Sequence, residues 1–216
     1  MTTTAADSIA DVVIPDTELV REITAFIRDA EDDLLFDHSR RVFLFGVLQG
    51  RRRGLQPDLE LLYAGAMFHD IGLTETYRTS MLRFEVDGAN AARDFLLDHG
   101  VGEADARKVW LSIALHTTPN VPEFLDPEIA LVTAGVETDV LGIDRDALSS
   151  DALEAVTTAH PRPDFKRRIL RAFNDGNKHR PHSTFGNVNA DVLDYFDPSF
   201  VRDDFVDIIR NNGWPE

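Results

Sequence analysis

The chain has 216 residues, 43% of them hydrophobic, and its 22 lysine and arginine residues against 38 aspartate and glutamate residues give a formal net charge of -16. This length suffices for one domain with a sizeable core, and the acidic surface disfavours nucleic acids and anionic membranes as partners. There is no cysteine, which excludes disulfides and sulfur ligands, so any metal ion would be held by nitrogen and oxygen atoms.

The N-terminal residues 1–14 are small, polar and acidic, and they predict a flexible tail. The opening MTTTAADS lacks the basic and apolar regions of a signal peptide, and no apolar run approaches the roughly 20 residues that span a bilayer. We therefore expect a cytoplasmic protein without a membrane partner. Residues 15–216 are expected to form a single helical domain.

Apolar residues at helical spacing predict two helices early in this domain. The first begins after Pro15-Asp16-Thr17 and is expected only to pack. The second covers about residues 35–52 and ends at Gly54, where a left-handed cap is expected. His38 falls on its inward face, four residues before Val42. A lone inward histidine is more often structural than a metal ligand.

The next helix begins at Pro57-Asp58 and contains the stretch LYAGAMFHDIGL, from Leu62 to Leu73. Its apolar run ends in the polar pair His69-Asp70. An imidazole and a carboxylate on a segment suited to burial must be satisfied by hydrogen bonds, a counter-charge or a metal ion.

A similar spacing occurs on two further helices, which begin at about Glu103 and at Pro127. In each helix two apolar residues lie four positions apart, and a polar residue follows three positions later, on the same face. The three sets are Leu62, Ala66 and His69; Val109, Ile113 and His116; and Val132, Val136 and Asp139. Several buried imidazoles and carboxylates on separate helices suggest that they converge on a shared cation.

The ordered set of His38, His69-Asp70 and Asp139 on helices resembles the HD superfamily of metal-dependent hydrolases, over roughly residues 37–142. The surrounding motifs DHSRRVFLFG, MFHDIGLT, RFEVDGANAARDFL, IALHTTPN and GVETDVLG are similar to those of the cyanamide hydratase-like branch. The resemblance implies an all-α helical bundle of the HD type.

The resemblance also implies one divalent ion, bound by His38, His69, Asp70 and Asp139. Zinc is the first choice, and imidazole and carboxylate ligands also suit iron and manganese. Some HD proteins hold two ions with further histidines. This chain offers His116, but Glu85 stands where another ligand would be expected, which disfavours a dinuclear iron oxygenase.

Such an ion makes hydroxide available at neutral pH. In the hydratase interpretation, this hydroxide attacks the nitrile carbon of cyanamide or a similar small molecule, and urea or an amide forms. The candidate proton-transfer groups are His116, Glu85 and Asp70.

Two alternatives stay open beside the hydratase interpretation. The first is a phosphohydrolase of nucleotides or other phosphate monoesters, in which Arg78 and Arg83 would hold the phosphate. The second is a non-catalytic, metal-dependent ligand sensor. The overall acidity and an apolar lining that includes Phe68 favour a small neutral substrate.

The C-terminal part is expected to complete the bundle. Residues 176–189 form a long polar segment, either a surface loop or a lid from which Lys178 or Thr184 contacts the substrate. The last helix, at about residues 198–211, is amphipathic. We expect it to dock on the bundle or to serve a contact in a homo-oligomer.

Overall fold

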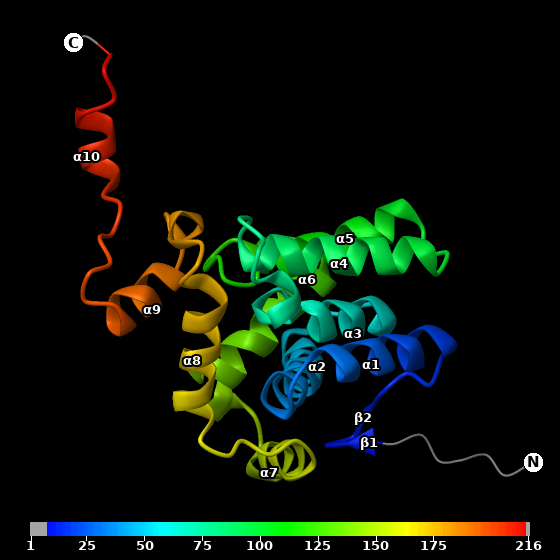
Figure 1. The fold of residues 1–216 in the computed structure, drawn as a ribbon. Helices are drawn as coiled ribbons and strands as arrows, with labels where there is room; N and C mark the ends of the chain where they lie inside the picture. Colours follow the sequence, from blue (N-terminus) through cyan, green and yellow to red (C-terminus); the bar gives the residue numbers. More distant parts are fainter. Residues whose placement is uncertain (1–7, 215–216) are drawn as a thin grey trace, which may run out of the picture.

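A computed structural model describes residues 8–214, and helices dominate it (Figure 1). The longer elements are α1 (Glu18–Ala30), α2 (Asp33–Arg53), α3 (Leu59–Phe68), α4 (Phe84–Asp98), α5 (Glu103–Ala114), α6 (Pro127–Val136), α7 (Ser150–Ala159), α8 (Phe165–Asn177), α9 (Asn189–Phe196) and α10 (Phe205–Arg210). Short helical turns are η1 (Ile71–Leu73), η2 (Glu75–Tyr77), η3 (Pro122–Phe124), η4 (Glu137–Leu141), η5 (Arg145–Ala147) and η6 (Pro181–Thr184). The predicted all-α class is confirmed.

Side-chain caps fix the ends of the first helices. The hydroxyl of Thr17 accepts a hydrogen bond from the backbone N–H of Val20, and the Asp58 carboxylate accepts from the N–H groups of Glu60 and Leu61. Gly54 ends α2 with a φ of 70°, a conformation that favours glycine. These three boundaries were predicted from the sequence.

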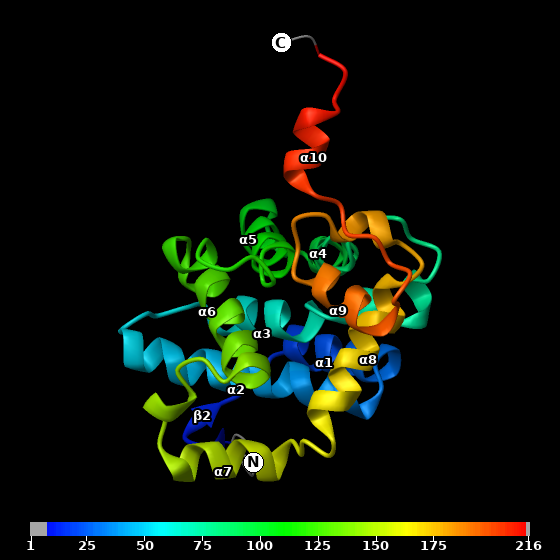
Figure 2. The ribbon, with the colours of Figure 1, turned by 90° about the vertical axis from the view of Figure 1, so that its left-hand side faces the viewer.

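Helix α3 lies in the middle of the bundle, among α1, α2, α4, α5 and α6 (Figure 2). Every residue from Leu61 to Phe68 is buried, because neighbours cover the helix on all sides. The chain therefore delivers His69 and Asp70, which follow directly, to the interior.

Helices α2 and α6 pack closely at Gly135. A Cβ atom there would lie 2.2 Å from the carbonyl oxygen of Val42, so a larger residue would push the two helices apart. The close approach brings the N-terminal half of α2, with His38 and Arg41, against Asp139 just beyond α6.

The expectation of a flexible tail over residues 1–14 is wrong for its second half. Strands β1 (Ser8–Ile9) and β2 (Val12–Val13) pair as an antiparallel hairpin. Its two turn residues, Ala10 and Asp11, have positive φ angles, as a two-residue hairpin turn requires. Val12 is fully buried, and this apolar contact outweighs the polar composition. Residues 1–7 lie outside the described part of the chain.

Of the two roles expected for the last helix, docking on the bundle is wrong, and a contact in a homo-oligomer stays a prediction. Helix α10 is shorter than predicted and projects away from the bundle (Figure 1). None of its residues is buried, because the extended segment before it carries the chain away from the apolar surface of the bundle.

Among residues 8–214, no helix combines the length and the apolarity that crossing a membrane requires.

Candidate metal centre

The end of α3 and the start of α2 bring three predicted ligands together. His69 caps α3, Asp70 follows in the turn, and His38 lies one turn into α2. All three side chains are shielded from solvent. Gly72 allows this turn to pass the start of α4, since a Cβ atom there would lie 2.1 Å from the carbonyl oxygen of Phe84.

The donor atoms of these residues face one another. The Nε2 atoms of His38 and His69 are 3.2 Å apart, and Oδ2 of Asp70 lies 3.6 Å from the first and 3.3 Å from the second. Nδ1 of His69 donates to the carbonyl oxygen of Ala66, and Nδ1 of His38 donates to Asp139. In the neutral rings both Nε2 atoms therefore present lone pairs.

This arrangement fits a divalent cation. Ligand atoms about 2.0 Å from a tetrahedral ion lie about 3.3 Å from one another, close to the separations seen here. Both oxygens of Asp70 are buried without a hydrogen-bond partner, which is costly unless a cation satisfies them. Imidazole nitrogen and carboxylate oxygen suit zinc, iron and manganese alike.

His69 and Asp70 each shift the pKa of the other toward its charged form. Burial alone would raise the pKa of Asp70, but the surrounding histidines, His69 foremost, together hold this pKa below its usual range. Burial alone would lower the pKa of His69, but the charge of Asp70 raises it. Burial lowers the pKa of His38. Protons therefore compete with a metal ion for His69, and metal affinity should fall as the pH falls.

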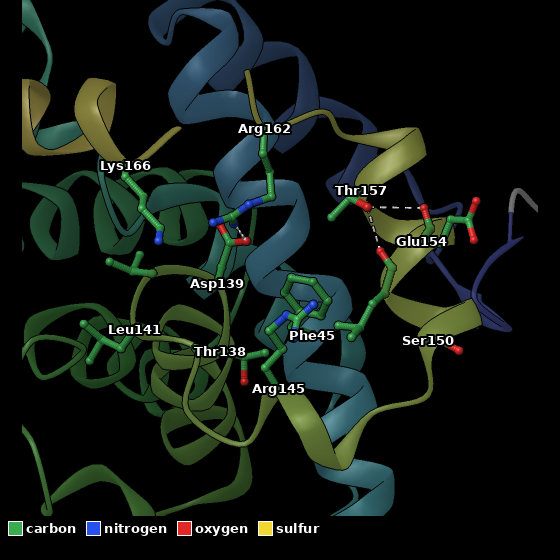
Figure 3. Close-up of a pocket in the computed structure, with 13 residues that line it drawn as sticks. Phe45, Thr138, Asp139, Leu141, Arg145, Ser150, Glu154, Thr157, Arg162 and Lys166 are labelled. Carbon is green, nitrogen blue, oxygen red and sulfur yellow. Dashed lines mark hydrogen bonds and ion pairs between the residues drawn. The ribbon is translucent and has the colours of Figure 1, made fainter. Parts of the chain in front are cut away.

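The fourth predicted ligand, Asp139, lies behind His38 and outside this group of donors. It sits in the π-helical turn η4, where Oδ2 accepts from His38 Nδ1 at 2.7 Å. Arg41 donates to both oxygens, at 2.9 and 3.0 Å, and Arg162 donates to Oδ1 (Figure 3). In this arrangement Asp139 orients His38, as the carboxylate partners of metal-bound histidines commonly do.

His116, at the end of α5, approaches the donors from another side. Its Nδ1 donates to the carbonyl oxygen of Ile113, while Nε2 lies 3.8 Å from Oδ1 of Asp70 and has no hydrogen-bond partner. Burial and the neighbouring His69 lower the pKa of His116 to about 4. At neutral pH this side chain is a neutral base with a free lone pair.

Glu85, the other predicted proton-transfer group, is fully engaged instead. Its Oε1 accepts from Arg83 at 2.9 Å, from the Thr117 hydroxyl at 2.5 Å and from the side-chain amides of Asn187 and Asn189. Burial alone would raise the pKa of Glu85, but Arg83, His116 and Thr117 together lower it. These bonds hold Glu85 ionised and anchor residues 187–189 to α4.

The side chains of the other residues predicted to contact substrate have partners other than the metal donors. Arg78 pairs with Glu75, and Lys178 is exposed and pairs with Asp175. The Thr184 hydroxyl donates to the carbonyl oxygen of Pro181. The ring of Phe68 packs against Phe26 and Phe95 in the main core. Phe84, which faces His116, and Phe165, which faces His38, are the rings beside the site.

Glu31 is a buried acid that sequence reasoning missed, because it belongs to the acidic run Glu31-Asp32-Asp33, typical of a solvated connector. Its Oε1 has no hydrogen-bond partner, and Ser39 donates weakly to Oε2. Burial and the negative charge of Asp70 raise the pKa of Glu31 well above its usual range. Both effects favour the protonated carboxyl of Glu31 over the carboxylate.

We expect Glu31→Gln to stabilise the metal-free protein more at pH 8 than at pH 5. The raised pKa of Glu31 contributes stability that is fully present below its unfolded pKa and is lost as the pH rises through the folded pKa. Glutamine cannot ionise, so the variant does not lose this stability as the pH rises. Thermal unfolding should show a relative gain of at least about 3 °C in Tm at pH 8. The exposed Glu18→Gln serves as the control, and an equal difference at both pH values would contradict the assignment.

The comparisons with known proteins agree with this geometry. The family model described as HD domain matches residues 35–155, more than half of the chain, and this range contains every donor named above. No curated protein matches the chain.

Proposed function

Because the chain belongs to the HD domain family of metal-dependent hydrolases, we propose that it is a metal-dependent hydratase that adds water to the nitrile of a small neutral molecule such as cyanamide. The observation that carries the proposal is the convergence of donor atoms from His38, His69 and Asp70 in a buried, aromatic-lined site, beside the unpaired Nε2 of His116.

The ion and its environment supply the electrophilic chemistry. When bound, a divalent ion lowers the pKa of coordinated water to about 7 and polarises the substrate. His38, His69 and Asp70 would hold it, and Asp139 would keep His38 in the required orientation. The surrounding rings exclude bulk water and favour an uncharged substrate over a charged one.

The protein also offers a group for proton transfer. As the water oxygen bonds to the nitrile carbon, Nε2 of His116 accepts a proton, since its low pKa keeps it neutral beforehand. His116 then passes this proton to the nitrile nitrogen, and the remaining hydroxyl proton moves from oxygen to the same nitrogen, which gives the amide. For cyanamide the product is urea.

The alternative, hydrolysis of a phosphate monoester, requires cations that are free to face the donors. Arg41 is instead bound to Asp139 and Arg83 to Glu85, both of which are buried carboxylates. This engagement of the nearby guanidinium groups favours the hydratase.

The proposal is tested with the metal-loaded protein, cyanamide and a urea assay, in parallel with a phosphate-release screen over nucleotides. Urea formation that is lost on chelation and restored by metal is the expected result. Phosphate release without urea formation would replace the hydratase with a phosphohydrolase.

We further expect His116→Ala to lower kcat for urea formation by roughly 100-fold or more, the usual contribution of a general base, while bound metal is retained. The control is His99→Ala, because the exposed His99 likewise bonds a backbone carbonyl through Nδ1. Unchanged turnover in His116→Ala would remove this residue from the mechanism.

A further inference from the structure

A cavity of about 620 Å³ opens on the far side of Asp139 from the metal donors. It lies between α2, the turns η4 and η5, α7 and the start of α8 (Figure 3). Asp139 and Phe45 form its inner wall, and none of His38, His69, Asp70 and His116 lines it. Its volume lies within the range of about 300–1,000 Å³ typical of small-molecule sites.

Positive charge gathers in this cavity, although the whole chain is strongly acidic. Arg162 and Lys166 project into it, and Arg145 lines it from η5 (Figure 3). Arg41 and Arg162 share the single carboxylate of Asp139, so one positive charge there is not neutralised. Among the residues that the structure describes, the neighbouring basic residues Arg162, Arg167 and Arg168 form ion pairs and Lys166 forms none.

The negative groups nearby do not neutralise these cations. The carboxylate of Glu154, on α7, points away from Arg162 and Lys166 (Figure 3). Within residues 8–214, the one ion-pair partner of Arg145 is Asp146, which is almost fully exposed, and exposed pairs hold charges weakly. Guanidinium and ammonium groups converging from separate elements are the usual means of binding phosphate.

We propose that this cavity is a binding site for a phosphate-bearing small molecule, held by Arg162 and Lys166 with Arg145 at the rim. The apolar side chains of Phe45 and Leu141 supply a surface for the rest of the ligand. The site is separate from the proposed reaction centre, and its existence does not depend on the proposed reaction.

The site is connected to the metal donors by direct contacts. Arg162 donates to Asp139, and Asp139 accepts from His38. A phosphate that draws Arg162 away leaves Asp139 more negative toward His38, which makes His38 a stronger electron donor. Phosphate and metal should therefore each strengthen binding of the other, since such coupling is reciprocal.

Binding of inorganic phosphate, measured by calorimetry at constant ionic strength, tests the site. Both metal-loaded and chelated protein are used, with circular dichroism to verify that the chelated protein stays folded. We expect about one phosphate per chain in both forms, and Kd at least tenfold weaker in Lys166→Ala. The control is Lys108→Ala, which removes a lysine of α5 that pairs with Asp105 outside the cavity.

Phosphate binding that disappears on chelation would place the anion at the metal and overturn the proposal, as would equal Kd values for wild type and Lys166→Ala. The coupling is measured by competition for zinc with a chromophoric chelator. Phosphate should tighten zinc binding at least fivefold in wild type but not in Lys166→Ala. Equal tightening in both proteins would show that phosphate acts through the metal and would refute the coupling.

Discussion

Replacing His69 by alanine is expected to reduce bound metal by at least about tenfold and to abolish urea formation. The change removes one of three donors whose atoms lie 3.2 to 3.6 Å apart, and the loss should exceed the 10- to 100-fold effect typical of residues that only support a ligand. The metal content is measured by elemental mass spectrometry after exhaustive dialysis.

The fold should survive this substitution. His69 follows the last residue of α3, and the alanine leaves the apolar face of that helix intact, so far-ultraviolet circular dichroism should be nearly unchanged. His182→Ala, at an exposed histidine, is the control. Full metal occupancy in folded His69→Ala would refute the assigned ligand set.

Replacing Arg180 by methionine is expected to lower the free energy of unfolding by about 3–5 kcal/mol, the usual cost of breaking a buried ion pair. Arg180 is fully buried, pairs with Asp87, and donates to the carbonyl oxygens of Gly72, Gly176 and Leu82. Methionine fills much of the same space but leaves all four acceptors without this donor.

Urea-induced unfolding, followed by circular dichroism, measures this loss. The control is Arg171→Met, at an exposed position of α8, the helix that precedes Arg180, which should change stability by less than about 0.5 kcal/mol. Equal losses in the two variants would contradict the structural role of Arg180. Because Arg180 holds the segment that follows His69-Asp70, its replacement should also weaken metal binding.

The sequence was informative where local chemistry decides the structure. Thr17, Asp58 and Gly54 set helix ends through contacts within a few residues. The spacing of four and then three residues identified His69 and His116 as inward-facing, because a helix has a fixed period.

Contacts between residues far apart in the chain could not be predicted from the sequence. The place of Asp139 depends on Arg41 from α2 and Arg162 from the segment before α8, which only the packed bundle brings together. The burial of Glu31 likewise depends on how distant helices pack, which the local sequence does not indicate. Phe68 was predicted to contact substrate, but the helical period cannot say that its ring meets Phe26 and Phe95. The projecting α10 shows that an amphipathic pattern does not ensure a docking surface.

The most direct test of the metal centre is the metal content of the purified wild-type protein, measured by elemental mass spectrometry. The described part of the chain contains one set of converging donors, formed by His38, His69 and Asp70, which predicts about one divalent ion per chain, with zinc the first choice. Two irons per chain would contradict this ligand set. A second ion would need further ligands such as His116 or Asp139, which are assigned to proton transfer and to the orientation of His38. A chain that takes up no metal when refolded with zinc, iron or manganese would contradict the ligand set as well.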